Sequence, residues 1–332
     1  MSQTATKPVD STFNWGEFVR KYLIVGILIG LIILVGALTG GKLLQVQNLM
    51  NIVVQVAPIG IMACGMTFVI IALGIDLSVG SIVALAAVVS ASLVQMPDAQ
   101  PKMYPALLLP AIVGIIAGMA VGTAAGAVNG FLVAKFKIAP FIATLGMMTA
   151  ARGLANLYAD GRPVSRLDPN FNFLGQGSLL GIPVPILIFA TVALLTHVML
   201  NYTRFGRHTY AIGGNEQAAR VSGINVSMVK FKIYTLSGFF AGIAGMILAA
   251  RVGSGNPALG QGIELDAITA TVIGGTSFAG GIGTAWGTVV GALIIGVINN
   301  GMDLMNVSPF MQLVVKGVII VLAIIIDERK NR

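Results

Sequence analysis

The chain has 332 residues, of which 56% are hydrophobic and only 10% are charged, and it carries a net charge of +8. Because soluble domains carry about 25% charged residues, this composition excludes a protein whose surface mainly faces water. In a membrane protein the basic excess is expected in cytoplasmic loops, so it does not indicate a nucleic-acid-binding surface.

Apolar runs long enough to cross a bilayer recur along the chain. Residues 1–21 precede them and are predicted to be a retained cytoplasmic tail. Their basic residues are spread over a longer segment than in a signal peptide, and no cleavage site clearly ends the next apolar run. A transmembrane domain over residues 22–326 follows, and residues 327–332 form a short C-terminal tail. Its ten candidate spans cover about residues 22–38, 50–73, 77–95, 104–133, 138–158, 183–201, 233–250, 267–282, 284–302 and 309–326. The glycine-rich segment 267–282 either crosses the membrane or re-enters it.

The distribution of Lys and Arg orients these spans. With the N-terminus inside and ten crossings, the C-terminus also lies inside, and the inner loops then hold most of the 20 basic residues. The outer loops hold only Lys42, Lys102, Arg162, Arg166 and Arg251. The positive-inside rule therefore favours an all-α, multi-pass membrane protein with both termini in the cytoplasm.

Glycines recur every fourth residue through the span at 104–133. On a helix this spacing places them along one face, where a second helix can approach closely. The stripe consists of Gly114, Gly118, Gly122, Gly126 and Gly130. Helix packing is the favoured interpretation, and a smooth face on which helices slide during gating is the alternative.

Signatures of catalysis and of metal binding are nearly absent. The two histidines, His197 and His208, belong to no metal-ligand motif, and Gly40-Gly41-Lys42 lacks the spacing of a phosphate-binding loop. We therefore expect a protein that is not an enzyme, holds no metal and binds no ATP, so active transport would draw energy from a partner or an ion gradient.

Two acidic segments echo each other along the chain. Gly74-Ile75-Asp76-Leu77 is followed by Ser78 and Ser81, and Gly262-Ile263-Glu264-Leu265 is followed by Asp266. Because ionisable groups at membrane depth usually have a partner or line water, Asp76, Ser78, Ser81, Glu264 and Asp266 are candidates for a translocation path or gate. The favoured structural role of Asp76 is to cap a helix that starts near Leu77. The second copy follows five spans later in the opposite orientation, which indicates an inverted repeat of spans 2–5 and 7–10.

The inner loop 202–232 contains a short helix bounded by glycines. Asn215 is a suitable N-cap for Glu216–Ser222, Gly223 is a suitable stop, and Glu216 and Arg220 stand four residues apart. The helix is either a solvated connection or a docking element for a cytoplasmic partner.

Several strings of residues are similar to those of a known family. Glu216-x-Ala218-Ala219-x-x-x-Gly223 resembles the docking-loop motif of ATP-binding-cassette (ABC) importer permeases, with Gln217 as a departure at its first alanine. From about residue 45 onward the chain resembles the ribose-type monosaccharide permeases. The matching strings are G-M-T-F-V-I (65–70), G-I-D-L-S-V-G-S (74–81), F-I-A-T-L (141–145), G-G-N-E-Q-A-A-R-V-S-G-I-N-V (213–226), E-L-D-A-I (264–268) and G-G-T-S (274–277).

This resemblance implies a transport subunit of a bacterial inner membrane. Its expected partners are a second permease copy, a cytoplasmic ATPase pair that binds ATP and Mg²⁺, and a periplasmic sugar-binding protein. The residues implied in coupling to the ATPase are Gly213, Gly214, Asn215, Glu216, Ala218, Ala219, Arg220 and Gly223. Ribose is the first expectation for the sugar, while galactose, xylose, allose and signalling furanosides stay open.

An ion-coupled secondary transporter of a small polar solute is the alternative. Such a protein needs ion sites near the membrane midplane. The available ionisable residues are Asp76, Arg152, Lys316 and Asp303, which lie mostly near the ends of spans.

Overall fold

The structure is a computed structural model that describes residues 15–104 and 109–330. Within these residues the chain forms thirteen α-helices, one 3₁₀ turn at Lys42–Leu44 and four strands of two residues each. The helices are α1 (Trp15–Leu38), α2 (Val46–Ile71), α3 (Val79–Leu93), α4 (Ala111–Lys135), α5 (Pro140–Tyr158), α6 (Pro169–Gln176), α7 (Val184–Tyr202), α8 (Arg204–Gly214), α9 (Glu216–Val221), α10 (Val226–Val252), α11 (Ile263–Ile273), α12 (Ala285–Leu304) and α13 (Pro309–Lys330).

Six helices are long and apolar enough to cross a membrane: α2, α4, α7, α10, α12 and α13. The stretch Leu23–Leu38 of α1 and the whole of α3 are shorter apolar helices. The all-α, multi-pass class is therefore confirmed. In the segment 267–282, which was expected either to cross the membrane or to re-enter it, α11 ends at Ile273 and glycine-rich turns follow it. At 1.5 Å per residue α11 is about 16 Å long, which is roughly half the hydrocarbon thickness.

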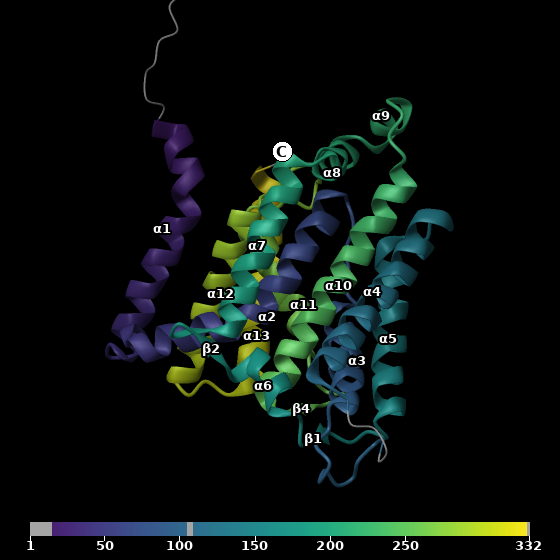
Figure 1. The fold of residues 1–332 in the computed structure, drawn as a ribbon. Coiled ribbons are helices and arrows are strands. Elements are labelled where there is room, and N and C mark those ends of the chain that lie inside the picture. The colour runs from purple at the N-terminus through teal and green to yellow at the C-terminus, as the bar shows by residue number, and fades with distance from the viewer. Residues whose placement is uncertain (1–14, 105–108, 331–332) are drawn as a thin grey trace, which may run out of the picture.

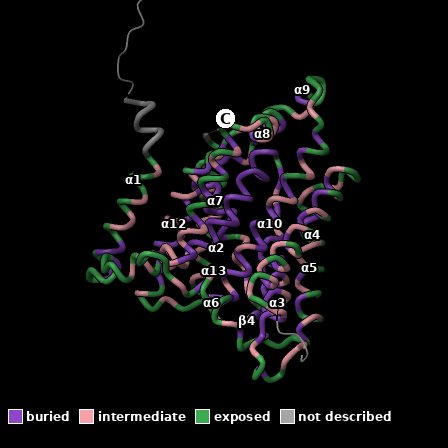
Figure 2. Tube along the Cα trace, viewed as in Figure 1, coloured by how far each residue is buried: buried purple, intermediate pink, exposed green. Residues whose placement is uncertain are grey.

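The helices form one bundle whose centre is occupied by α2 and α10 (Figure 1). Figure 2 shows these two helices as largely buried, whereas α1 at the edge of the bundle is mostly exposed. Their buried apolar side chains form the main core, which includes Ile61, Met62 and Phe68 of α2 and Ile233, Phe240 and Ile247 of α10. Since lipid replaces water around the bundle, exposed apolar residues on the outer helices carry no penalty.

Helices α8 and α9 lie at one end of the bundle, where the start of α1 and the C-terminus also lie (Figure 1). The opposite end carries α6 and the short strands. There β1 (Val164–Ser165) pairs antiparallel with β4 (Ser254–Gly255), and β2 (Ser178–Leu179) pairs antiparallel with β3 (Ile182–Pro183). The β1–β4 pair ties the loops after α5 and α10 together, and an isolated bridge between Gln95 and Leu167 joins the loop after α3 to them. The predicted outer loop 159–182 is therefore an ordered structure.

The glycine stripe of α4 lies against α10 over most of its length. A Cβ atom at Gly122 would meet the backbone of Gly238 and Gly242, and one at Gly126 would meet the backbone of Tyr234 and Gly238. Gly130 faces Phe231 and Gly118 faces Met246, while Gly114 faces α3. The structure thus places the stripe where two backbones meet, as close helix packing requires.

Candidate coupling helix and translocation site

The short helix α9 is capped at both ends by the residues that flank it in the sequence. The Oδ1 atom of Asn215 accepts a hydrogen bond from the Ala218 amide at 2.9 Å, which confirms the predicted N-cap. Gly223 follows the helix with a φ of 85°, a left-handed conformation that favours glycine. The amide of Ile224 then donates to the Ala219 carbonyl at 3.1 Å, so the helix is shaped by local sequence alone.

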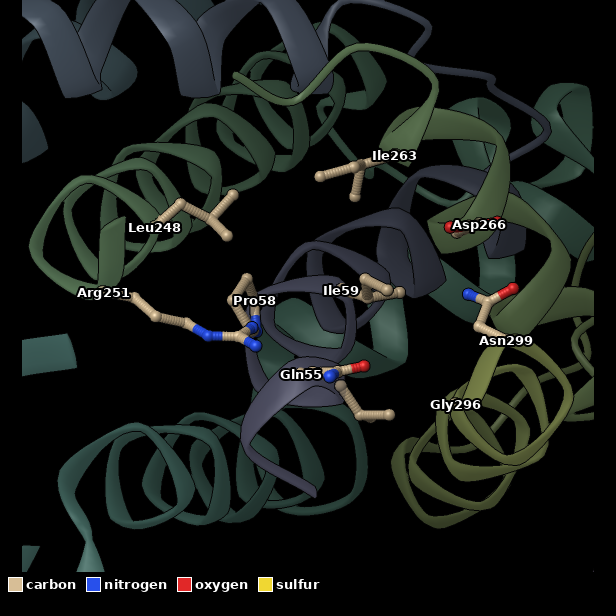
Figure 3. Close-up of a pocket in the computed structure, with 10 residues that line it drawn as sticks. Gln55, Pro58, Ile59, Leu248, Arg251, Ile263, Asp266, Gly296 and Asn299 are labelled. Carbon is tan, nitrogen blue, oxygen red and sulfur yellow. The ribbon is translucent and has the colours of Figure 1, made fainter. Parts of the chain in front are cut away.

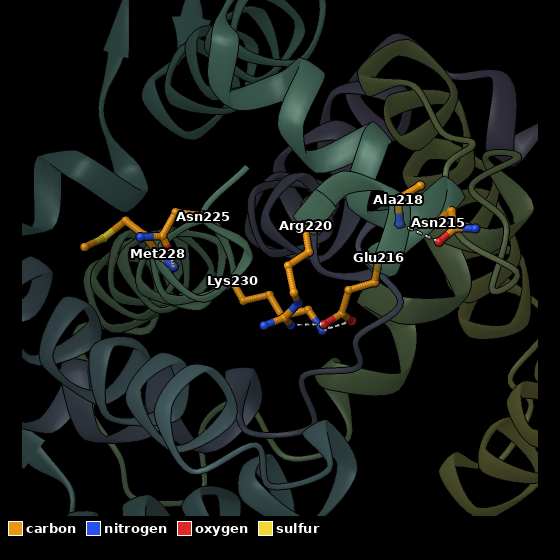
Figure 4. Close-up of polar contacts among 7 residues, drawn as sticks. All are labelled: Asn215, Glu216, Ala218, Arg220, Asn225, Met228 and Lys230. Atoms are coloured by element: carbon orange, nitrogen blue, oxygen red, sulfur yellow. Dashed lines mark hydrogen bonds and ion pairs between the residues drawn. The ribbon is translucent and has the colours of Figure 1, made fainter. Parts of the chain in front are cut away.

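Glu216 ties α9 to the start of α10. Its carboxylate accepts from Arg220 at 3.0 Å, as predicted, and from Lys230 at 2.7 Å, which sequence spacing did not reveal (Figure 4). The hydrogen bond from Lys230 is the main reason that the pKa of Glu216 is lowered. A lowered pKa means that the ion pair stabilises the fold above the ordinary glutamate range and is lost only as pH falls through the depressed value.

The residues of α9 are exposed to different degrees. Ala219 is only 4% exposed, whereas Val221 is 89% exposed and Ala218 is also exposed. Gly213 is a packing residue, because a Cβ there would meet the Ile71 carbonyl and Gly281. The helix α8, which precedes α9 and ends at Gly214, was not anticipated from the sequence. A partner that docks on α9 therefore meets Ala218 and Val221, with Ala219 beneath them.

Asp76 is fully buried in a cluster of hydrogen bonds between three segments. Its Oδ1 accepts from the amide of Ser78 at 3.0 Å and from the Ser78 hydroxyl at 2.5 Å, and its Oδ2 accepts from Ser237 of α10 at 2.9 Å. Asn129 of α4 donates to the Ser78 hydroxyl at 2.8 Å. The predicted cap is wrong in form, because α3 begins at Val79 and its N-cap residue Ser78 makes no side-chain capping bond. Asp76 instead holds the segment before α3 against α4 and α10.

The starts of α3 and α11 lie next to each other inside the bundle. A Cβ at Gly80 would meet the Gly260 carbonyl and the carboxylate of Glu264. Arg152 of α5 joins the two segments, since its guanidinium donates to the carbonyls of Pro257, Leu259 (2.8 Å) and Gly80 (3.3 Å). Glu264 lies within the first turn of α11 and does not precede the helix as expected. Ser81 and Glu264 line one cavity of about 730 Å³ with Arg152.

Asp266 points to a second, smaller cavity on the other side of α11. This cavity of about 260 Å³ is also lined by Gln55, Arg251 and Asn299 (Figure 3). Asp266 forms an ion pair with Lys316 of α13 at 2.8 Å. The sequence did not reveal this pairing, because the two residues are 50 positions apart along the chain. Such a pair offsets part of the cost of both charges at membrane depth.

The five candidate gate residues thus fall into three places. Asp76 and Ser78 form the buried cluster, Ser81 and Glu264 line the larger cavity, and Asp266 pairs with Lys316 at the smaller one. Arg152 and Lys316 entered the sequence analysis only as candidates for an ion site and were not assigned to the translocation path.

Comparison with known proteins gives consistent matches over most of the chain. A family model described as the permease component of a branched-chain amino acid transport system matches residues 48–324. The ribose import permease protein of Bacillus subtilis is 45% identical over 311 residues, covering 92% of this chain and 93% of the relative. The galactose/methyl galactoside import permease protein of Haemophilus influenzae is 40% identical over 317 residues, covering 93% of each chain. The L-arabinose transport system permease protein of Escherichia coli is 37% identical over 332 residues, covering 100% of this chain and 98% of the relative. No solved structure matches the chain.

The apolar helix bundle and these matches define a membrane-embedded transport subunit. The chain belongs to the permease family of ABC importers, as the resemblance of its docking loop indicated. A permease component carries no catalytic domain, and ATP is bound by the partner ATPase. The family assignment also decides against an ion-coupled secondary transporter.

Proposed function

We propose that this permease translocates a monosaccharide, with ribose as the first candidate, across a bacterial inner membrane. The observation that carries the proposal is the match, at 37–45% identity and nearly full length, to permeases named for ribose, galactose and arabinose. In the proposed mechanism a periplasmic binding protein delivers the sugar, and ATP binding by the ATPase pair drives alternating access. Selectivity can then reside partly in the delivery protein.

Helix α9 is the proposed contact with the ATPase. Its exposed Val221 offers an apolar docking point, and the Glu216–Lys230 ion pair connects that point to α10, which runs through the centre of the bundle. A displacement of α9 would therefore be passed to α10, and from α10 to the Asp76 cluster through Ser237.

The proposed topology has ten crossings and cytoplasmic termini. The six long spans, the shorter apolar helices in α1 and α3, and α5 would provide nine of these crossings, and α11 together with the glycine-rich turns that follow it would complete the tenth. The start of α1 and the C-terminus lie at the same end of the bundle as α9, which supports a cytoplasmic location for both (Figure 1). The adjacent starts of α3 and α11 support an inverted repeat that places two broken helices face to face.

We propose that the exposed face of α5 meets a second copy of the chain. Thr149, Gly153 and Asn156 share one face of this helix and are exposed. Polar groups that face lipid are costly, so this face is expected to meet a water-lined path shared with the partner copy.

The test is a reconstituted system of permease, ATPase and binding protein in proteoliposomes. Binding protein loaded with D-ribose is expected to stimulate ATP hydrolysis and to deliver the sugar into the vesicles. Gly223→Pro should leave the permease in the membrane but uncouple uptake from hydrolysis. A cysteine at Val221 should cross-link to the ATPase, whereas one at the buried Ala219 should not. Absence of uptake with every candidate sugar would reject the proposal.

A further inference from the structure

The larger cavity is built from three segments that each bring polar groups to it. Arg152, Thr149 and Asn156 come from α5, Ser81 comes from the first turn of α3, and Gln261 and Glu264 come from the start of α11. Its volume of about 730 Å³ lies within the range of sites for small molecules. At 1.5 Å per residue Arg152 lies about 9 Å from the end of α5 at Tyr158, so the cavity lies along the exposed face of α5, on the side of the bundle where α6 and the strands lie.

One polar atom in the wall beside this cavity lacks a partner. The Oε2 atom of Glu264 is buried and accepts no hydrogen bond within the described part of the chain. A buried acceptor without a donor is costly and is usually explained by a missing ligand, ion or water. Gly80, which has no side chain, provides the space in which this carboxylate lies.

The positively charged side chain next to Glu264, that of Arg152, already has hydrogen-bond partners. Arg152 donates to three backbone carbonyls, of Pro257, Leu259 and Gly80. Its guanidinium therefore holds the walls of the cavity together and is poorly placed to pair with an anionic ligand. What the cavity offers is a carboxylate acceptor, the amides of Gln261 and Asn156, and two hydroxyls. These groups suit a neutral molecule with several hydroxyl donors and acceptors better than a carboxylate or phosphate ligand.

We propose that this cavity is a monosaccharide-binding site within the permease itself, in which the carboxylate of Glu264 accepts a hydrogen bond from a sugar hydroxyl. The inference rests on the proposed function and adds a second point of selection after the binding protein. Such a site should be weak, with a dissociation constant in the millimolar range, because a transported sugar has to leave it again.

The test is protection of a cysteine from a thiol reagent in the permease–ATPase complex without binding protein. Cys64 is buried, so it should contribute little to labelling. Gly153→Cys places a thiol in the cavity wall, where the added Cβ has open space. Gly146→Cys is the matched control, since it also has open space on α5 but does not line the cavity. D-Ribose at about ten times its dissociation constant should slow labelling at position 153 roughly tenfold by mass action and leave position 146 unchanged.

Glu264→Ala in the Gly153→Cys background should raise the D-ribose concentration needed for half-protection by about tenfold or more, because it removes a charged hydrogen-bond acceptor. Leucine, a zwitterion, should give no protection. Equal protection by leucine would overturn the assignment to a neutral sugar. No protection by D-ribose, L-arabinose or D-galactose up to about 100 mM, in a preparation that imports sugar when binding protein is added, would overturn the site and leave the proposed function standing. Failure of import with every sugar would instead reject the proposed function.

Discussion

Glu216 forms two unequal ion pairs, one within α9 with Arg220 and one with Lys230 of α10. The side chain of Lys230 is 19% exposed and that of Arg220 is 54% exposed, so the pair with Lys230 is less screened. We predict that Glu216→Gln and Lys230→Met each lower the sugar transported per ATP, and that the double variant is hardly worse than either. A double-mutant cycle on coupled uptake should give an interaction of about 0.2–1 kcal/mol. Arg220→Met is the control, and a larger loss there than in Lys230→Met would contradict the assignment.

Asp76 accepts hydrogen bonds at both carboxylate oxygens, and none of its partners is a charged group. We predict that Asp76→Asn keeps substantial uptake, because the amide oxygen can accept from Ser78 and the amide nitrogen can donate to Ser237. Asp76→Leu should abolish uptake or prevent accumulation, since each buried donor left unpaired costs about 1–3 kcal/mol.

The measurement is sugar uptake by the two variants at equal abundance in the membrane. Asp303→Asn serves as a control, because Asp303 accepts from Gln312 at 2.9 Å far from this cluster. Complete loss in both Asp76→Asn and Asp76→Leu would favour a charge-dependent role for Asp76, such as proton transfer.

The contact between α4 and α10 depends on glycine at both surfaces. At Gly122 an added side chain would meet the backbone of α10. Unlike a side chain, this backbone cannot relieve the clash by changing rotamer. We predict that Gly122→Leu destabilises the protein by at least about 1–3 kcal/mol, the usual cost of overpacking. Gly30→Leu in α1 is the control, because its Cβ position is open, and it should change stability by less than about 0.5 kcal/mol. The midpoint of thermal unfolding in detergent measures both, and equal shifts would disprove the contact.

The two short helices α3 and α11 have a common environment in the bundle. Each begins inside the bundle, and Arg152 joins the start of α3 to the loop that leads into α11. Neither helix could form this arrangement alone, because the unpaired backbone groups at a helix start need partners where water is scarce.

The proposed ten-crossing topology of the bundle predicts on which side of the membrane each loop lies. A reporter inserted at Leu180, which is fully exposed in the turn between β2 and β3, should be active only as a periplasmic fusion. A reporter fused after Arg332, which lies outside the described residues, should be active only as a cytoplasmic fusion. Leu180 is a better insertion point than Asp168, because Asp168 caps α6 through the amide of Asn170 at 2.7 Å. Activity of both fusions on the same side would reject the ten-crossing topology.

The sequence by itself determined the membrane class, most span positions and the short helix α9 with both of its ends. These features depend on composition and on interactions within a few residues, such as the bond between Asn215 and Ala218. Only the tertiary structure decided how the charges at membrane depth are paired. Arg152 contacts carbonyls more than 100 residues away along the chain, and Asp266 pairs with Lys316 over 50 residues. The spacing of a sequence carries no record of such contacts, because they arise only when separate helices pack side by side and must satisfy their polar groups without water.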